Sequence, residues 1–483
     1  VTKSSSLGFS NAQATEYADN YSLWVLGQTS KLSVAGVEAQ RTVYNAQALP
    51  SDTYAFGKLQ QHHEYNTDGT LANSTDGRGN RTGYSNYKRG LPQNVSFADG
   101  KSASANVNDL GLITRFTNEA GTTTAYDYDT AGRLKLITPP SENGISVNAT
   151  SLTFESVANA EYDLPAGHWR QTVTTGNAKT VNYFDAFWRK VLTQTYDASN
   201  VSGTQRMPVF QYDADNRETY QSNPTASITG VNATNIYGTR TWYDALGRAT
   251  DVWGDSELGM LKAKTEYLYG FKTKLTDKRG HETTQTLGAY EDPSKSFLIG
   301  MQGPQGLNLA ITRDAFGKPL SITKSGTNAG ITTSVTRSYV YDANQRLCKT
   351  IEPELGATLQ DWDAAGNLAW TSGGVALTSS SCDRASVPSA KKISHAYDAR
   401  NRLTNTSYGD GSATVTRTYT ADGLLQTLSS GASVWSYDYN NRRLLKSESL
   451  ALGSTTYPLT LGLNGNGHLA SLTYPDNTRL DYA

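Results

Sequence analysis

A short phrase, Tyr-Asp-x-x-Gly-Arg, recurs along most of this chain and limits its fold more than any other feature does. Close copies begin at Tyr128, Phe184, Tyr212, Tyr243, Tyr341, Trp362, Tyr397 and Tyr437. Looser copies begin at Tyr65, Val107, Arg313, Tyr419 and Leu463. Internal repetition of this kind indicates one structural unit that is used many times.

The residues around one loose copy show what the unit is. In "SATVTRTYTADGLLQTLSS", residues 412–430, Val415, Arg417 and Tyr419 alternate with threonines before the turn. After the turn, Leu424 and Leu428 continue the same alternation. A period of two on both sides of a short polar turn predicts two antiparallel strands joined in a hairpin.

Each letter of the full motif has a role in such a hairpin. The aromatic residue ends the first strand and offers surface to a neighbouring strand. The Asp side chain accepts a backbone N–H two residues on, which forms an Asx turn, and Gly or Asn at the fifth position tolerates a positive φ. The Arg begins the return strand, where its planar head stacks on an aromatic ring or reaches a carboxylate. The residues that take these roles are Tyr128, Asp129, Gly132, Arg133, Tyr212, Asp213, Arg217, Tyr243, Asp244, Gly247, Arg248, Tyr341, Asp342, Arg346, Tyr397, Asp398, Arg402, Tyr437, Asp438 and Arg442.

The composition agrees with strands and tight turns. The 483 residues include 43 Gly and 29 Tyr but only 3 Met, and 18% are charged. The sequence therefore predicts an all-β fold made of repeated antiparallel β-hairpins. We expect residues 1–60 to form an irregular first segment with β-strands. Residues 61–483 are expected to form the hairpin array, which continues beyond both ends in a longer protein.

The Tyr-Asp-x-x-Gly-Arg-Leu spelling resembles the RHS-repeat, or YD-repeat, family from about Tyr65 to the end of the chain. That family includes bacterial Rhs effectors, the B–C component of Tc toxins, wall-associated bacterial proteins and teneurins. Its repeats form a ribbon of hairpins coiled into a hollow barrel or cocoon, which in bacterial toxins encloses a C-terminal toxic polypeptide. The resemblance implies a solenoid-like hollow shell here. The family's core segment with Asp-Pro-x-Gly-like spelling is not recognisable, so no residue is assigned to self-cleavage.

The two cysteines, Cys348 and Cys382, lie in neighbouring repeats and leave two readings open. A disulfide between them would close a loop of about 35 residues and add roughly 3–4 kcal/mol in the chain-entropy model. Such a bond would favour an oxidising compartment. The other reading is two unrelated small buried residues.

Charge and hydropathy exclude several classes of function. The net charge is −1, and Lys and Arg are spread singly, which argues against a nucleic-acid partner. No apolar run approaches the roughly 18 residues of a membrane-spanning helix. No spelling identifies a cofactor, a metal site or a catalytic residue. The adjacent His62 and His63, for example, would point to opposite faces of a strand.

Three functions remain. The leading one is the wall of a secreted or cell-surface shell, which encloses or presents a C-terminal toxin-like polypeptide of the same longer chain for delivery. The second is a carbohydrate-binding or adhesion module for a cell-surface glycan. Its stacking candidates are Trp24, Trp169, Trp253 and Trp370, whereas Trp188, Trp242, Trp362 and Trp435 are assigned to sheet packing. The third is a polysaccharide-degrading enzyme, for which the sequence selects no carboxylates.

Overall fold

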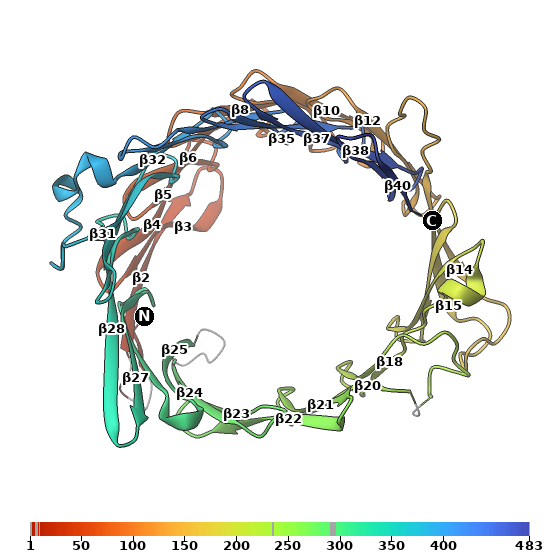
Figure 1. The fold of residues 1–483 in the computed structure, drawn as a ribbon, viewed down its shortest axis with the longest axis horizontal. Coiled ribbons are helices and arrows are strands. Elements are labelled where there is room, and N and C mark those ends of the chain that lie inside the picture. Colours follow the sequence, from red (N-terminus) through yellow and green to blue (C-terminus); the bar gives the residue numbers. More distant parts are fainter. Residues whose placement is uncertain (1, 5–7, 9, 234–235, 290–295, 483) are drawn as a thin grey trace. The chain divides into compact units, whose positions relative to one another are not determined.

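The structure consists almost entirely of antiparallel β-hairpins, as the sequence predicts (Figure 1). It is a computed structural model that describes residues 2–4, 8, 10–233, 236–289 and 296–482. The strands belong to two sheets of 17 and 23 strands. The prediction of an all-β fold built from repeated hairpins is therefore confirmed.

The first sheet contains β1 (Thr2–Ser4), β2 (Ser10–Asn20), β3 (Val25–Val34), β4 (Val37–Tyr44), β5 (Pro50–Ala55), β6 (Lys58–Tyr65), β7 (Leu71–Asp76), β8 (Arg81–Lys88), β9 (Leu91–Ser96), β10 (Ser102–Val107), β11 (Ile113–Thr117), β12 (Thr123–Tyr128), β13 (Leu134–Thr138), β14 (Thr150–Ser156), β15 (Trp169–Thr175), β16 (Ala178–Phe184) and β17 (Lys190–Asp197). The short helical segments are α1 (Val201–Thr204), η2 (Pro304–Gly306), η3 (Arg384–Ser386) and η4 (Ser389–Lys391).

The second sheet contains β18 (Phe210–Tyr212), β19 (Glu218–Ser222), β20 (Gly238–Tyr243), β21 (Ala249–Ser256), β22 (Gly259–Leu268), β23 (Lys272–Thr276), β24 (Glu282–Gly288), β25 (Phe297–Gln302), β26 (Asn308–Arg313), β27 (Pro319–Asn328), β28 (Ile331–Tyr341), β29 (Leu347–Glu352), β30 (Gly356–Trp362), β31 (Leu368–Val375), β32 (Ile393–Tyr397), β33 (Leu403–Tyr408), β34 (Val415–Tyr419), β35 (Leu425–Ser430), β36 (Ser433–Tyr439), β37 (Leu445–Leu452), β38 (Thr455–Leu463), β39 (Leu469–Thr473) and β40 (Arg479–Asp481). None of the helices in the described ranges has the length and apolar character needed to cross a membrane.

The contacts within the chain divide it into two compact units. Unit 1 contains residues 1–123, 286–462 and 471–483, and unit 2 contains residues 124–285 and 463–470. Residue 61, where we expected the hairpin array to begin, lies inside β6, which pairs with both β5 and β7. Regular hairpins are therefore already present before that residue.

One turn geometry closes hairpins in both units. In the turn from Asp244 to Arg248, the Asp244 N–H donates to the Arg248 carbonyl at 2.9 Å. The Gly247 N–H donates back to the Asp244 carbonyl at 3.0 Å, and Gly247 has a φ of 78°. The same two bonds, with a positive φ at the fourth residue, occur in the turns that begin at Asn45, Asn66, Asp76, Phe97, Asn108, Asn118, Asp129, Asp185, Asp213, Asp277, Asp314, Asp342, Asp363, Asp398, Thr420, Asn440, Asn464 and Tyr474.

The fourth residue of the turn is not always glycine. Trp188, Gln345 and Arg443 hold this position with φ values of 63°, 59° and 67°. A left-handed conformation costs a residue with a Cβ roughly 1–2 kcal/mol. The hydrogen bonds of the turn therefore fix the backbone even where the sequence supplies an unfavourable residue.

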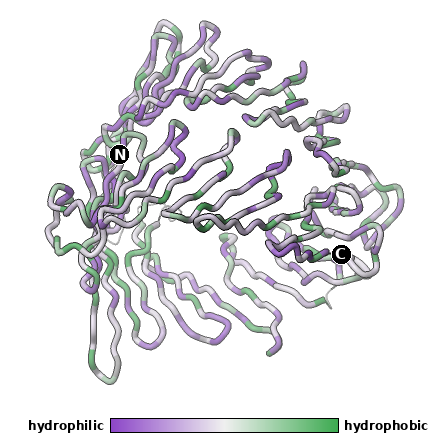
Figure 2. The backbone as a smooth tube through the Cα atoms, turned by 45° about the horizontal axis from the view of Figure 1, so that its top comes forward, coloured by the Kyte–Doolittle hydropathy of each residue, from purple (hydrophilic) through white to green (hydrophobic). Residues whose placement is uncertain are grey.

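Buried apolar clusters lie where a loop covers one face of a sheet. In unit 2, Leu192 of β17 is fully buried beside Leu164 and Val231, which come from loops outside the strands. In unit 1, Leu359 of β30 is buried beside Val387, which belongs to the segment between β31 and β32. Along the strands, hydrophobic and hydrophilic residues are closely mixed (Figure 2). The main contacts are thus those between neighbouring hairpins.

The turn geometry generates a stability prediction with opposite signs at two positions. Gly247→Val should destabilise its hairpin by roughly 1–2 kcal/mol because of the left-handed φ. The Cβ itself would only touch Arg217 at an ordinary 3.5 Å. Gln345→Gly should stabilise its hairpin by up to about 1 kcal/mol, after the added flexibility of glycine is offset. Amide hydrogen exchange in the flanking strands measures both changes.

Ala245→Val, in the same turn but without a positive φ, is the control and should leave exchange nearly unchanged. Faster exchange throughout the chain in Gly247→Val would show that the hairpins do not open independently. Equal effects at Ala245 and Gly247 would contradict the conformational explanation.

Candidate functional site

The turn aspartate closes the hairpin with its side chain as well as its backbone. Asp244 Oδ1 accepts the N–H groups of Leu246 at 2.9 Å and Arg248 at 3.0 Å. Asp244 Oδ2 accepts a hydrogen bond from Arg248 Nε at 2.7 Å. The Arg248 backbone N–H, followed by the Arg248 side chain, holds the pKa of Asp244 below its usual value. One carboxylate therefore holds both ends of the turn and orients the arginine.

A two-way contact joins one repeat to the next in unit 2. The Arg217 guanidinium lies over the ring of Tyr243, 5.1 Å from its centroid, which is cation–π distance. In the other direction, the Tyr243 hydroxyl donates to the carbonyl of Glu218 at 2.7 Å. Because Glu218 directly follows Arg217, each repeat contacts its neighbour twice at the same place. We call this arrangement the repeat clamp.

The repeat clamp recurs wherever a basic residue ends one turn and a tyrosine follows one hairpin later. The rings lie under the cations in the pairs Arg189–Tyr212, Arg248–Tyr267, Lys318–Tyr341 and Arg402–Tyr419. The matching tyrosine hydroxyls donate to the carbonyls of Lys190, Ala249, Pro319 and Leu403. Burial raises the pKa of Tyr212 and Tyr341, which keeps these hydroxyls protonated as donors.

The structure places most of the predicted turn residues in these roles. Asp129, Asp213, Asp244, Asp342 and Asp398 each accept the backbone N–H groups of the third and fifth turn residues. Arg133, Arg217, Arg248, Arg346 and Arg402 donate Nε to those carboxylates. Gly132 and Gly247 hold the positive φ. The hydroxyls of Tyr212, Tyr243, Tyr341 and Tyr397 reach the preceding repeat, and Tyr128 ends β12.

The assignment of Tyr437, Asp438 and Arg442 is wrong by two residues. Tyr437 and Asp438 lie inside β36, opposite Glu448 and Ser447 of β37. The turn begins at Asn440 instead, and Arg443 takes the position with positive φ. The letters do not decide between the two alignments, because an Asx residue that can cap the turn stands at both Asp438 and Asn440. The observed one lets the Tyr439 hydroxyl reach the Leu425 carbonyl at 2.9 Å and so completes the contact with the preceding repeat.

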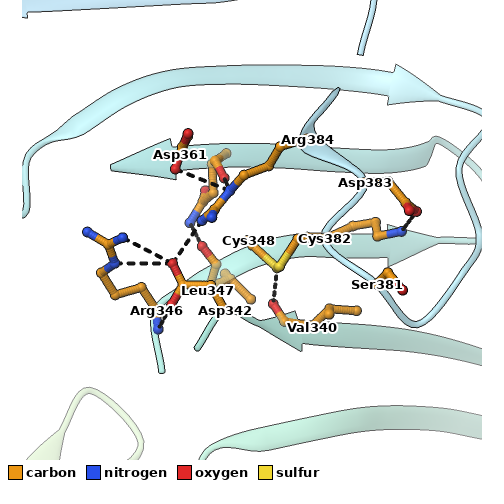
Figure 3. The surroundings of a disulfide bond; sticks show 12 residues. Val340, Asp342, Arg346, Leu347, Cys348, Asp361, Ser381, Cys382, Asp383 and Arg384 are labelled. Atoms are coloured by element: carbon orange, nitrogen blue, oxygen red, sulfur yellow. Dashed lines mark hydrogen bonds and ion pairs between the residues drawn. A yellow bond between two sulfur atoms is a disulfide. The ribbon is translucent and has the colours of Figure 1, made fainter. Parts of the chain in front are cut away.

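A disulfide fixes the segment between β31 and β32, residues 376–392, to the sheet (Figure 3). Cys348 of β29 is bonded to Cys382, so of the two readings left open by the sequence the structure has the bridge. Next to it, Arg384 Nη2 lies 2.9 Å from Asp342 Oδ2, and Arg384 Nε lies 3.2 Å from Asp361 Oδ1. The segment therefore adds a second arginine to a turn aspartate that Arg346 already contacts.

Lys349, beside the disulfide, is the largest fully buried side chain in the structure. Its Nζ donates to Asp383 Oδ2 at 2.5 Å and to the Ser379 carbonyl at 2.9 Å. A buried ammonium group requires such partners, because leaving it unpaired would cost several kcal/mol. Neither Lys349 nor Arg384 is part of the repeated spelling, and so sequence reasoning missed both.

In unit 1, two rows of hairpin turns from distant parts of the chain lie against each other, and we call this contact the seam. The Arg78 guanidinium donates to the carbonyls of Tyr397 and Asp398 at 3.0 and 3.1 Å. Arg400 Nη2 lies 2.6 Å from Glu119 Oε1. The rows approach so closely that a Cβ on Gly77 would lie 2.2 Å from the Ala364 carbonyl oxygen. The seam is thus a specific interface between two stretches of the same ribbon.

The four tryptophans proposed for glycan stacking have different environments. In unit 1, Trp24 is exposed on the turn between β2 and β3, and Trp370 of β31 lies under Lys392 beside a buried cluster. In unit 2, Trp169 packs in a cluster with Phe154 and Trp188, in which each ring is stacked with the other two. Trp253 is partly exposed, with its ring centroid 5.0 Å from that of Trp242. Trp169 and Trp370 are therefore used in packing.

The described part of the chain contains no group of three or more His, Cys, Asp or Glu side chains arranged to hold a metal ion. The main features are the turn and the repeat clamp, which recur along the chain, and the seam in unit 1. These features build and join hairpins.

Comparison with protein families identifies an RHS repeat at residues 107–141. The chain therefore contains an RHS repeat over these residues. The matched residues include the complete turns that begin at Asn108, Asn118 and Asp129. The resemblance inferred from the Tyr-Asp spelling is therefore confirmed, and no curated protein matches the sequence.

Solved structures of Tc toxin components are similar to this chain. The crystal structure of TcdB2-TccC3-TEV is 11% identical, with a TM-score of 0.40, and the match covers 96% of this chain and 38% of that one. The Tc holotoxin pore of Photorhabdus luminescens is 12% identical, with a TM-score of 0.44 and coverages of 98% and 26%. TcdB2-TccC3 is 12% identical, with a TM-score of 0.32 and coverages of 95% and 31%. The chain thus spans well under half the length of these solved structures.

The corrected register makes a matched pair of variants in one strand. Tyr439→Phe removes the hydrogen bond to the Leu425 carbonyl and should cost about 1 kcal/mol. Tyr437→Phe, two residues earlier in β36, should be nearly neutral because its hydroxyl takes no part in the repeat clamp. Hydrogen exchange in β35 and β36 reports the difference. A larger effect at Tyr437 would contradict the register described above.

Acid should weaken the turns. In Asp129 and Asp244, the backbone N–H of the fifth turn residue and then its arginine side chain hold the carboxyl pKa below the usual value. A depressed pKa in the folded state stabilises the fold fully above the unfolded-state pKa of about 3.9, and this stabilisation is lost as pH falls through the lower, folded-state value. We expect the urea midpoint to fall progressively below about pH 4.

The control for the acid experiment is Asp129→Asn combined with Asp244→Asn. Asparagine occupies the same position at Asn108 and accepts the same two backbone N–H groups. The double variant should therefore fold at neutral pH and lose less stability in acid. A wild-type midpoint that stays constant down to about pH 2 would rule out this role for the carboxylates.

Proposed function

We propose that this chain is a wall segment of an RHS-type shell, which encloses or presents a C-terminal polypeptide of the same longer protein for secretion or contact-dependent delivery. The repeat clamp is the observation that carries the proposal. Because contacts such as those between Arg217, Glu218 and Tyr243 join neighbouring hairpins in both directions, many short units form extended sheets. The RHS repeat matched at residues 107–141 supports the proposal, because resemblance to that family implies a hollow shell built from such a ribbon.

The seam supports the same proposal by a different route. A wall has to join its layers as well as its neighbouring strands. In unit 1, charged and aromatic turn residues such as Arg78, Arg400 and Phe316 make that second type of junction. Turns that are buried against each other also protect the ends of the hairpins from unwanted association.

The disulfide between Cys348 and Cys382 supports a secreted or cell-surface location. Disulfides form and persist in oxidising compartments and are rare in reducing cytosol. The bridge also covers a fully buried lysine, Lys349, and so stabilises a region whose opening would leave a charge without its partner.

The proposal is tested on the protein as its native gene encodes it, by intact mass and limited proteolysis. We expect a mass well above 52.3 kDa and a C-terminal segment that resists protease while the wall is intact. Phe316→Asp, which breaks a seam contact with Phe56, should expose that segment to cleavage. Leu452→Asp, on the exposed end of β37, is the control and should leave it protected.

Two results would overturn the proposal. One is a native mass close to 52.3 kDa, which would leave nothing to enclose. The other is a C-terminal segment that is cleaved as quickly in the intact protein as it is when produced alone.

A further inference from the structure

The third residue of the turn makes several of the contacts of the seam in unit 1. In the turn from Asp314 to Lys318 this residue is Phe316, whose ring lies edge-on to Phe56 at a centroid distance of 5.0 Å. In the turn from Asp398 it is Arg400, which contacts Glu119 and lies 4.1 Å from the ring centroid of Phe97. The motif does not specify the type of this residue, so it can differ from turn to turn, and in the seam it makes contacts with the opposing row.

The opposing row follows the same rule. Arg78 is the third residue of the turn that begins at Asp76, and it donates to Asn401 Oδ1 at 3.0 Å. Asp99 is the third residue of the turn that begins at Phe97, and its Oδ2 lies 3.2 Å from Arg402 Nη2. The third residue is therefore one of the side chains that reach beyond the edge of the ribbon, together with fourth and fifth residues such as Asn401 and Arg402.

The two rows come from opposite edges of the ribbon. Turns that follow even-numbered strands, such as those beginning at Asp314 (after β26) and Asp398 (after β32), form one row. Turns that follow odd-numbered strands, such as those beginning at Asp76 (after β7) and Phe97 (after β9), form the other. The seam contacts follow both stretches in the direction of increasing residue number. Phe56 contacts Phe316 near one end, and Asn118 contacts Asp422 near the other. The seam therefore joins an even edge to an odd edge in parallel.

Unit 2 presents the even edge with apolar third residues exposed to solvent. Phe187, after β16, is 73% exposed, and Leu246, after β20, is 77% exposed. Between them, after β18, the third residue is Asp215, whose side chain is 71% exposed. Large apolar side chains at the tips of turns are costly to leave in water, and a row of them marks an interaction surface.

The odd edge of unit 2 presents a matching sequence. Leu258, between β21 and β22, is 86% exposed, and the next turn on that edge carries Arg279 as its exposed third residue. In chain order, the odd edge presents the apolar Leu258 and then the cationic Arg279. The even edge presents the apolar Phe187 and then the anionic Asp215. The two edges can therefore pair apolar with apolar and cation with anion. We propose that the even edge of unit 2, at Phe187, Asp215 and Leu246, docks on the odd edge of a second copy of this chain, at Leu258 and Arg279.

This association continues an interface that the chain already makes with itself in unit 1. It is also heterologous, because the two contacting surfaces differ. Copies joined in this way add head to tail rather than closing as a symmetric pair. The inference concerns contacts between copies and does not depend on whether the chain encloses a polypeptide.

Light scattering at increasing protein concentration tests the pairing. The proteins measured are the wild type and variants in which the charges at Asp215 and Arg279 are exchanged, singly and together. Asp215→Arg and Arg279→Asp should each weaken association at least tenfold, because each single change places like charges opposite each other. The double variant should restore association to near the wild-type level. A wild-type chain that stays at 52.3 kDa at every concentration would overturn the proposal. So would a double variant as weak as the single ones.

A photo-reactive benzoylphenylalanine at position 187 or 246 identifies what the edge touches. Crosslinks from either position to residues 257–281 of another copy are the expected result. The same group at position 316 is the positive control and should crosslink to the Phe56 turn of its own chain. At position 457, an exposed tyrosine within β38, it should give no crosslink. Crosslinks from 187 and 246 to any other region, or to a different protein, would contradict the assignment.

Discussion

A single carboxylate oxygen that accepts two backbone N–H groups is the contact on which the rest of this structure depends. In the turn from Asp129 to Arg133 it fixes the spacing of two strands and leaves the second oxygen to orient the arginine. Where the first residue of the turn is aromatic, another residue of the turn supplies the carboxylate that accepts the backbone N–H. Asp99 and Asp476, both third residues, then accept the N–H of the fifth residue. The turn therefore tolerates changes in spelling as long as one acceptor remains in reach.

Because of this contact, the positions of the turn have different structural roles. The first and fourth residues satisfy the backbone, and the fifth reaches the next repeat, as Arg217 does toward Tyr243. In turns whose first residue is the cap, the side chains of the second and third residues are not needed to satisfy the backbone. Phe316 and Arg400 show that the third position is then available for contacts with other parts of the ribbon. Different positions of the same motif thus determine the folding of the turn and its contacts with other parts of the ribbon.

The same division explains what could be predicted from the sequence. The hairpins and the roles of Asp244, Gly247 and Arg248 follow from local chemistry, since each acts within five residues. The register at Tyr437 could not be decided locally, because Asp438 and Asn440 are equally good caps. It was fixed by the contact of Tyr439 with the preceding repeat. Contacts such as Lys349 with Asp383, or Arg78 with Asn401, join residues that share no pattern, and only the folded chain reveals them.

The repeat clamp also determines how such a ribbon would respond to force. Along the ribbon, strand pairs such as β36 and β37 are joined by a turn at one end, so tension on the chain opens their hydrogen bonds one after another. Across the seam, by contrast, several turn-to-turn contacts would have to yield together. The ribbon would therefore resist separation of its layers more strongly than the peeling of a single free hairpin. A protein with this construction can be unravelled in order from one end while the remainder keeps its structure.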